Sequence, residues 1–414
     1  MKEKFKEFLN NTDRVDLKII IAVLFLCIFG CMMVYSASSY ICETREQFNY
    51  DDAYLLKRNM IFIVAGFVGI FLLQFIDYHI LYWMNWKVYL LAVVFILLLK
   101  TPLGEEVNGA TRWINVGGFT IHVGELTKIL VIIYLAYMMA EHFAVRDRIS
   151  SIIKLWAYSG ILCFLILIIS SNLSTALIMV MITFGMTFIW SNRTKFHLAA
   201  GGIVIAIVAI VLLYIYFNMP DPQEAQNVHY QIKRILGWMA PEKYQDVFSD
   251  QILQSLYAVG SGGFFGKGLG NSMQKLSKIP EPQNDMIFAI ICEELGIFGG
   301  MIVLLLMGYL ILQLVRVAMD AKDLYGGMLV VGVILHLSFQ TIVNVSVALN
   351  IFPNTGVSLP FISYGGSSMM LMLAEIGLVL SVRRYRVLRD FEKQVKLERA
   401  ERSIVRRNRS PKRI

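Results

Sequence analysis

Long runs of apolar residues, each about as long as a membrane-spanning helix, recur along most of the chain. A transmembrane helix needs about 20 predominantly apolar residues. Ten segments meet this pattern, at residues 17–37, 59–75, 79–99, 124–140, 155–171, 173–190, 197–217, 286–315, 327–349 and 364–382. The pattern predicts an all-α polytopic membrane protein with about ten transmembrane helices.

Two polar segments interrupt this pattern and are too long to be simple connectors. One covers residues 101–123, and the other covers residues 218–285, between the seventh and eighth predicted helices. Apolar residues recur at helical spacing within the second segment, at Val247, Ile252, Leu253, Leu256 and Tyr257. We therefore expect a large extracellular loop that contains a helix lying along the membrane surface.

The composition excludes a soluble globular protein. Apolar residues make up 57% of the 414 residues and charged residues only 16%, against about 25% charged residues in ordinary globular domains. The formal net charge is +8, and residues 382–414 alone hold 13 basic and 4 acidic side chains. The basic character belongs to the tail, where it indicates membrane topology, and nucleic acid is not an expected partner.

Basic residues in the short loops predict the orientation, because cytoplasmic loops are enriched in Lys and Arg. With the N-terminus inside, the short inner loops hold eight basic residues and the short outer loops at most four. Ten crossings then return the C-terminus to the cytoplasm. We expect a transmembrane domain over residues 1–382, with outer loops at about 101–123 and 218–285, and a basic cytoplasmic tail over 383–414.

Asp285 is the most informative candidate for chemistry, because it directly precedes the eighth predicted helix. One interpretation is a helix N-cap, for which Asp is among the best residues, and position alone favours it. The other is a partly desolvated carboxylate whose pKa suits proton abstraction. The hydroxyls and glycines of residues 363–368 lie on the same outer face, and together these groups fit a site for an anionic amphiphile.

Other charges occur in segments where the membrane makes a charge costly. Glu125 and Lys128 are three residues apart at the outer start of the fourth helix, so they share a face and can pair, with Arg112 nearby. Glu293 and Glu294 lie one or two turns into the eighth helix and are expected to face the bundle interior. Ion pairing and contact with a substrate are both open roles for the Glu125–Lys128 pair and for the two glutamates of the eighth helix. For the two glutamates a proton relay is also open.

The glycine-rich run at residues 260–270 resembles a phosphate-binding loop but departs from its pattern. Ser261 and Gly268 occupy positions that the pattern reserves for Gly and for Ser or Thr. A flexible turn at the membrane surface is one interpretation, and an anion held by backbone N–H groups beside Lys267 is the other. The histidines, cysteines and carboxylates show no metal-ligand spacing, so no metal site is predicted.

Four motifs, in order along most of the chain, resemble the SEDS family of bacterial shape, elongation, division and sporulation proteins. They are Asn108-Gly-Ala-Thr-Arg-Trp-Ile-Asn115, Ile279-Pro-Glu-Pro-Gln-Asn-Asp-Met-Ile-Phe-Ala289, Pro353-Asn-Thr-Gly356 and Leu359-Pro-Phe-Ile-Ser-Tyr-Gly-Gly-Ser-Ser368. The chain also departs from the family pattern. The Gln-Pro-Ser-Glu motif appears as His122-Val-Gly-Glu125, and the Asp-Leu-Gly-Thr motif as Asn172-Leu-Ser-Thr175.

The resemblance implies the SEDS fold and a peptidoglycan glycosyltransferase, a hexosyltransferase that polymerises lipid II for the cell wall in elongation, division or sporulation. It also implies a class B penicillin-binding protein as partner, which is a single-span transpeptidase, together with other elongation or division proteins. Asp285 is then the expected base, and the predicted substrate contacts are Arg112, Glu125, Lys128, Arg234, Lys267, Glu281 and Ser363. Of these, the four basic residues are candidates for steadying the diphosphate.

A divalent cation, Mg or Mn, could share the role of these basic residues, although the sequence shows no dedicated site. Two other functions remain open. A flippase or transporter of lipid-linked precursors would also have many spans and embedded glutamates, and broken helices would favour it. A non-catalytic scaffold of the wall-synthesis complex would leave Asp285 as a helix cap only.

Overall fold

The computed structural model describes residues 15–107, 110–117, 119–276, 279 and 281–409. Within these residues, nine helices are long and apolar enough to span a membrane. They are α2 (Val15–Thr44), α3 (Tyr54–Leu73), α6 (Val123–Glu141), α7 (Ile149–Ser170), α8 (Leu173–Trp190), α9 (Thr194–Phe217), α13 (Ile287–Asp320), α14 (Leu324–Ala348) and α15 (Gly366–Arg409). Two short 3-10 helices, η1 (Glu46–Phe48) and η2 (Phe143–Val145), lie in the connections.

The third predicted span, residues 79–99, is not one helix. It divides into α4 (His79–Met84) and α5 (Trp86–Leu98) at Asn85, whose backbone has φ 39° and ψ −119°. The Asn85 side chain accepts a hydrogen bond from the N–H of Trp86 at 2.6 Å, which begins the second helix. The 13 residues of α5 extend for about 20 Å, which is less than the hydrocarbon thickness of about 30 Å.

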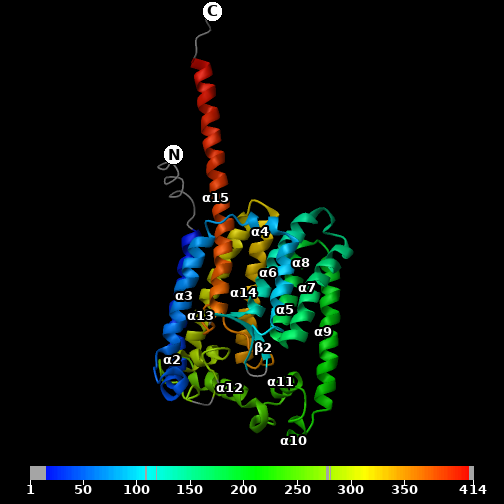
Figure 1. The fold of residues 1–414 in the computed structure, drawn as a ribbon, viewed down its shortest axis with the longest axis vertical. Helices are drawn as coiled ribbons and strands as arrows, with labels where there is room; N and C mark the ends of the chain where they lie inside the picture. Colours follow the sequence, from blue (N-terminus) through cyan, green and yellow to red (C-terminus); the bar gives the residue numbers. More distant parts are fainter. Residues whose placement is uncertain (1–14, 108–109, 118, 277–278, 280, 410–414) are drawn as a thin grey trace, which may run out of the picture.

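Burial differs sharply between the long helices, and Figure 1 shows α6 inside the bundle and α9 at one edge. In α6, 78% of the apolar window is buried, because α5, α8 and α14 all pack against it. In α9 the corresponding share is 0%, and His197 is the one residue of that helix that is buried. A helix that is apolar yet unburied is suited to face lipid, so α6 forms the centre of the bundle and α9 its lipid-facing edge.

The segment between α5 and α6 contains a small sheet, where the sequence predicts only a polar loop. The strands β1 (Gly104–Val107), β2 (Ala110–Val116) and β3 (Phe119–His122) pair antiparallel in the order β1-β2-β3. The register places Trp113 opposite His122, and their rings lie 5.5 Å apart. The all-α prediction therefore holds for the membrane bundle but not for this connection.

The long loop after α9 is itself largely helical. It contains α10 (Pro222–Ala225), α11 (Tyr230–Met239), the π-helix η3 (Gln245–Ser249) and α12 (Asp250–Gly262). The helix expected from apolar spacing is confirmed as α12, which buries Ile252 and Leu253 and packs against α13 and α14. These short helices lie across one end of the bundle, opposite the end from which α15 protrudes (Figure 1). We call these the loop end and the tail end.

A break in α13 explains the glycine-rich run that precedes it. The helix is interrupted at Gly296, where φ is 69° and ψ is −170°. The carbonyl groups of Glu293 and Glu294 accept hydrogen bonds from the N–H groups of Lys267 and Gly268, at 3.0 and 2.9 Å. These two N–H groups are therefore satisfied by the protein, and the expected anion site on the backbone beside Lys267 is not supported.

Close backbone packing requires a glycine within this contact. A Cβ atom at Gly262 would lie 1.9 Å from the carbonyl oxygen of Cys292 in α13. Such a contact is far inside van der Waals range, so the end of α12 approaches α13 closely only because residue 262 has no side chain. Within the glycine-rich run, Gly262 and Gly266 are therefore packed against α13, whereas Gly260, Gly263 and Gly270 meet no atom within 4 Å.

The predicted boundary between domain and tail falls inside one helix. α15 begins at Gly366 and continues without a break to Arg409. Arg383, the first residue of the predicted tail, is only 4% exposed and pairs with Asp16 at 3.1 Å and Asp320 at 3.3 Å. These contacts join α15 to α2 and α13 at the tail end of the bundle.

Candidate functional site

A polar cavity of about 450 Å³ lies at the loop end of the bundle. Its walls come from β2, β3, α3, α6, α8 and the segment that leads into α15. Three of the predicted site residues, Arg112, Glu125 and Lys128, line it. Arg58, at the start of α3, lines it too and was missed by the sequence analysis because it lies at the edge of an apolar span. Three cations and one carboxylate therefore share one cavity, an arrangement suited to an anionic ligand.

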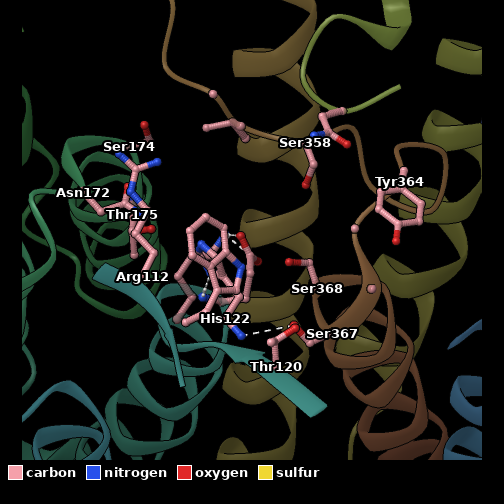
Figure 2. Close-up of a pocket in the computed structure, with 18 of the residues that line it drawn as sticks. Arg112, Thr120, His122, Asn172, Ser174, Thr175, Ser358, Tyr364, Ser367 and Ser368 are labelled. Carbon is pink, nitrogen blue, oxygen red and sulfur yellow. Dashed lines mark hydrogen bonds and ion pairs between the residues drawn. The ribbon is translucent and has the colours of Figure 1, made fainter. Parts of the chain in front are cut away.

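Hydroxyl and amide groups cover much of the remaining wall. Figure 2 shows them at the start of α8 on one side of the cavity, and in the first turn of α15 and the segment before it on the other: Asn172, Ser174, Thr175, Ser358, Ser367 and Ser368. The Ser174 hydroxyl donates to the carbonyl of Thr355 and so ties the two sides together. Such neutral donors and acceptors suit a ligand that carries sugar or phosphate oxygens as well as charge.

The Glu125–Lys128 pair predicted from the spacing is present and buried. The Lys128 Nζ lies 2.8 Å from both carboxylate oxygens of Glu125, and the Lys128 side chain is 1% exposed. Lys128 also donates to the amide oxygen of Gln340 in α14 at 2.7 Å. A buried charge requires both a partner and hydrogen bonds, and Lys128 has both while still lining the cavity.

His122 links the sheet to the helix that carries this pair. Its Nδ1 accepts the N–H of Glu125 at 3.1 Å and caps α6, while its own N–H donates to the Ser367 hydroxyl at 3.1 Å (Figure 2). Burial lowers the pKa of His122 to about 4; the Glu125 charge opposes this shift, and the cations Lys128 and Arg112 add to it. The imidazole is therefore neutral at pH 7, which leaves Nδ1 free to accept as the cap requires.

Asp285 is not the N-cap of α13. The helix begins at Ile287, its N-cap residue is Met286, and that residue makes no side-chain capping bond. The backbone carbonyl of Asp285 accepts a hydrogen bond from the Asn344 amide at 2.7 Å, and Gln251 lies 3.5 Å from the Asp285 carboxylate. The capping interpretation favoured by position is thus wrong, because the helix starts one residue later than a cap at Asp285 needs.

The Asp285 carboxylate and the Arg234 guanidinium flank the same glycine at the edge of the cavity. A Cβ atom at Gly356 would lie 3.8 Å from the Asp285 Oδ2 and 4.0 Å from an Arg234 terminal nitrogen. Gly356 and Asn284 themselves line the cavity. Gly356 also has φ 67°, a left-handed conformation that favours glycine. Asp285 and Arg234, two of the predicted site residues, therefore lie together at the cavity rim.

The Asp285 side chain is half-buried. Loss of water around it raises the pKa of Asp285 to about 6, the nearby Glu281 adds to the shift, and Arg234 together with the local backbone N–H groups opposes it. A carboxylate with this pKa is ionised at pH 7 and yet more basic than an ordinary Asp. These are the properties that proton abstraction near neutral pH requires.

The remaining predicted site residues lie elsewhere. Lys267 is not among the cavity-lining residues and pairs with Glu293 at 2.7 Å. Ser363 is 3% exposed, and its hydroxyl accepts the N–H of Leu359 at 2.8 Å within a turn. Glu281 is exposed and accepts a hydrogen bond from the Asn284 amide at 2.7 Å. Each of the three thus has a partner within the protein, and Glu281 also acts on Asp285 through its charge.

Both glutamates of α13 face the bundle interior, as expected, and both are 0% exposed. Glu293 is held by Lys267 and by the Ser272 hydroxyl at 2.5 Å. Glu294 is held by Lys275 at 2.8 Å and by Ser36 of α2 at 2.7 Å. Of the interpretations left open by the sequence, ion pairing is the one that these contacts support.

Metal ligands are not gathered at this site. Within the described parts of the chain, no group of three or more His, Cys, Asp or Glu side chains is placed to hold a metal ion. The positive charge that faces an anionic ligand in this cavity comes from the Arg and Lys side chains that line it.

Comparison with known proteins shows the family of this chain. The model of the FtsW/RodA/SpoVE family, described as cell cycle protein, matches residues 17–388. The chain belongs to this family. The SEDS resemblance read from the four motifs is thereby confirmed, as is the multi-pass membrane architecture.

Similar proteins in the family come from several bacteria. Stage V sporulation protein E of Bacillus subtilis is 37% identical over 380 residues, which cover 89% of this chain and 97% of that protein. A probable peptidoglycan glycosyltransferase FtsW of Trichlorobacter lovleyi is 36% identical, with 89% and 92% covered. The FtsW of Bacillus subtilis, also named a probable peptidoglycan glycosyltransferase, is 32% identical, with 89% and 90% covered.

Solved structures show the same fold. A chain from a peptidoglycan synthase complex that coordinates polymerization and crosslinking matches with a TM-score of 0.69 and 26% identity, covering 89% of this chain and 97% of that one. The rod shape determining protein RodA of Thermus thermophilus matches with a TM-score of 0.61 and 25% identity, covering 89% and 96%.

The departures from the SEDS motifs have local structural roles. Asn172 replaces an aspartate of the motif, and its side chain accepts the N–H of Thr175 at 3.1 Å, which caps α8. Asn caps a helix about as well as Asp, so the fold at this position needs no carboxylate. His122 replaces a Gln and caps α6 in a similar way.

Proposed function

We propose that this SEDS protein is a peptidoglycan glycosyltransferase that polymerises lipid II. The observation that carries the proposal is the Asp285 carboxylate, with its pKa raised to about 6, at the rim of a cavity that holds Arg58, Arg112 and Lys128. A base and a set of cations are what the transfer of a sugar from a diphosphate needs. The relatives named as probable peptidoglycan glycosyltransferases support the same activity.

Asp285 acts as the base in this proposal. Its carboxylate accepts the proton of the acceptor sugar's 4-hydroxyl as that oxygen attacks the donor's anomeric carbon. The bond between the anomeric carbon and the diphosphate oxygen breaks as the new glycosidic bond forms, so the configuration inverts in one displacement. One carboxylate suffices for this reaction, whereas a retaining glycosidase needs a second one as nucleophile.

The cavity cations stabilise the leaving group. Negative charge accumulates on the lipid diphosphate as its bond to the sugar breaks, and fixed positive charges in a site with little water stabilise that charge most effectively. Arg112, Lys128 and Arg58 line the cavity, and Arg234 lies at its rim beside Asp285. Of the predicted diphosphate contacts, we retain Arg112, Lys128 and Arg234, and we assign Lys267 to the support of α13.

The loop end is proposed to face outward, with both termini in the cytoplasm. The start of α2 and the protruding part of α15 lie at the same end of the bundle (Figure 1). This fits an even number of crossings, in which α4 and α5 together add a tenth to the nine long helices of the described residues. The basic residues after 382 would then lie inside, as the enrichment of Lys and Arg in cytoplasmic segments requires. This orientation places the cavity on the side of the membrane where the wall is built.

A class B penicillin-binding protein is proposed as the partner. Support comes from the solved structure of a peptidoglycan synthase complex, which coordinates polymerization and crosslinking and contains a chain similar to this one. We expect a lateral contact in the membrane with its single span, as part of an elongation, division or sporulation complex. Purified protein alone should then polymerise lipid II slowly and gain activity when the transpeptidase is added. Full activity that no such transpeptidase changes would contradict the partnership.

One observation favours the alternative function, a transporter of lipid-linked precursors. The helix α13 is broken at Gly296, and transporters use broken helices at their binding sites. In this chain, however, the carbonyls freed by the break are satisfied by the N–H groups of residues 267 and 268. The break therefore serves packing and does not leave unsatisfied groups for a substrate.

The deciding experiment is polymerisation of purified lipid II by the purified protein with a single-span transpeptidase. Formation of glycan chains by the wild-type protein, and their absence with Asp285→Asn, is the expected result. Movement of lipid II across a vesicle bilayer without polymer, equal in the two proteins, would favour the transporter. Absence of both activities would favour the scaffold.

A further inference from the structure

A chain of buried polar groups leads from the cavity into the middle of the bundle. It begins at Lys128 in α6, continues through Gln340 and His336 in α14, and ends at Glu375 in α15. The four residues are between 0% and 1% exposed. The proposed reaction uses only Lys128, so the other three need a separate explanation.

Hydrogen-bond partners fix the orientation of the Gln340 amide. Lys128 can only donate, so the Gln340 atom that it contacts at 2.7 Å is the oxygen. The Gln340 nitrogen donates to the backbone carbonyl of Ser358, a cavity-wall residue, at 3.2 Å. Because both ends of the amide are determined, the His336 Nε2 that lies 2.8 Å from the same oxygen must carry a proton and donate it.

The other side of the imidazole then constrains Glu375. The His336 Nδ1 lies 2.8 Å from one oxygen of the Glu375 carboxyl and 3.0 Å from the other. A hydrogen bond here needs one proton between the two groups, on Nδ1 or on the carboxyl. In either arrangement, His336 and Glu375 together are neutral, and so are Glu125 and Lys128. Two neutral pairs can remain buried, whereas a single unpaired charge could not.

The Gln340 oxygen therefore receives two donors, and its place depends on both. One is the Lys128 ammonium, which lines the cavity, and the other is His336, which Glu375 holds in a fixed orientation. Without His336, the Gln340 oxygen would have Lys128 as its only strong partner, so the position of the amide that holds the ammonium beside Glu125 would be less fixed. The His336 Nε2 also lies 3.8 Å from a Glu125 carboxylate oxygen, so the imidazole faces the same ion pair. A displacement of a charged group by about 1 Å is enough to lower the rate of an enzyme substantially.

We propose that His336, oriented by Glu375, is a positioning residue that acts through Gln340 to aim the Lys128 ammonium into the cavity. The inference rests on the proposed function, because it assigns Lys128 to the diphosphate of the lipid substrate. His336 itself does not line the cavity. Its role is to hold a group that does, in the way that outer-shell partners orient the residues of other active sites.

Variants can separate positioning from simple stabilisation. His336→Leu removes the donor but leaves the Glu375 carboxyl buried without its partner, so it should lose stability as well as rate. The double variant His336→Leu/Glu375→Leu removes both members of the neutral pair and should recover most of that stability. His197→Leu is the matched control, because His197 is also a buried histidine and lies outside the cavity.

Rates of lipid II polymerisation with the transpeptidase give the main readout. We expect kcat/KM of the double leucine variant to fall about tenfold at a melting temperature close to that of the wild type, since a hydrogen bond that supports a charged group is commonly worth a factor of this size. His197→Leu should lower the melting temperature and leave the rate per folded molecule within about twofold. A wild-type rate in the double variant would overturn the proposal.

A double-mutant cycle tests the route through Gln340. If His336 acts through this amide, Gln340→Leu should lower the rate, and adding His336→Leu/Glu375→Leu should change it by less than about twofold further. Losses that multiply would overturn the proposed route. If the leucine variants do not fold, His336→Gln decides, because its amide can still donate to Gln340. A rate within about threefold of wild type is then expected, and a tenfold loss at normal stability would count against the proposal.

Binding of lipid II in detergent separates this inference from the proposed function. If the wild-type protein binds lipid II and polymerises none, the glycosyltransferase proposal fails. Weaker lipid II binding by the double leucine variant than by the wild type would in that case still support the positioning of Lys128. Equal binding by the two proteins, in the absence of polymerisation, would overturn the positioning role as well.

Discussion

The substitution Asp285→Asn separates the chemical role of this residue from its structural one. Asn has nearly the same size, and its side-chain oxygen can still accept hydrogen bonds from the backbone N–H groups and from Gln251, which face the carboxylate. Asn344 binds the backbone carbonyl of residue 285, and the N-cap of α13 is Met286. The loop should therefore keep its shape in the variant. The change removes the ionisable group and little else.

The expected loss of rate follows from the proposed chemistry. An amide cannot accept the proton of the acceptor hydroxyl, and a positioned base typically contributes a factor of about 10² to 10⁴. For the wild-type protein, kcat/KM should rise with pH until about 6, the pKa of Asp285, and level off above it. Asp285→Asn should abolish this rise, because nothing remains at residue 285 to ionise.

The same pKa predicts the effect of the substitution on stability. Folding raises the pKa of Asp285 from an ordinary 3.8 to about 6, so the folded protein binds the proton more tightly than the unfolded chain. The resulting stabilisation is complete below about pH 4 and is lost as the pH rises through 6. At pH 7 the ionised carboxylate then costs about 3 kcal/mol, as an upper figure, and the Asn variant avoids this cost.

The assay combines glycan-chain formation from purified lipid II with thermal unfolding in detergent at pH 4 and pH 7. Asp285→Asn should form at least about 100-fold less polymer than the wild type while melting at the same or a higher temperature at pH 7. Its advantage in melting temperature should disappear at pH 4. Near-normal polymer would refute the assignment of the base, and lower stability at pH 7 would refute the desolvated carboxylate.

Three further changes test other parts of the structure. Alanine at Glu125 or at Lys128 should lower polymerisation strongly, because each change leaves a buried charge without its partner. The double variant in which the two residues are exchanged should recover part of the rate. If its loss is instead the sum of the two single losses, the two residues act separately. A cysteine at Gln245 should react with an impermeant thiol reagent from outside intact cells, whereas reaction only after lysis would reverse the orientation. Gly262→Ala should destabilise the protein by several kcal/mol, because the new Cβ clashes with α13. Gly260→Ala is the control in thermal unfolding and should have a milder effect, because a Cβ at residue 260 meets no atom within 4 Å.

Much of the membrane bundle could be predicted from the sequence, because apolar length alone identifies a span. The exception shows the limit of that reasoning. Residues 79–99 are apolar enough for one helix, yet Asn85 adopts a left-handed backbone and divides them. The sheet at residues 104–122 was missed for a different reason, since its strands are short and their stability comes from pairing with one another and from contacts with α6 and α15.

The candidate site was predictable where the signal was local. Glu125 and Lys128 pair because they are three residues apart in a helix, and Asp285 was selected because it precedes one. Gln340 and Glu375 gave no such signal. Gln340 is one of several uncharged polar residues in α14, and Glu375 is the one acidic residue of its apolar span. Their contacts with other helices arise only through the packing of α14 against α6 and α15. A polar residue alone in a span predicts a partner, but not which helix supplies it.

Lys267 shows why charge in a sequence does not by itself identify a ligand contact. Lys128 and Lys267 both stand near a glutamate and near predicted catalytic motifs, so both appeared suited to a diphosphate. In the folded chain each has its glutamate partner at 2.7–2.8 Å, because a carboxylate within the membrane must be neutralised whatever its function. Only Lys128 also borders the cavity. Exposure to a common cavity, rather than the presence of a charge, distinguishes a cation that can serve a substrate from one that serves the fold.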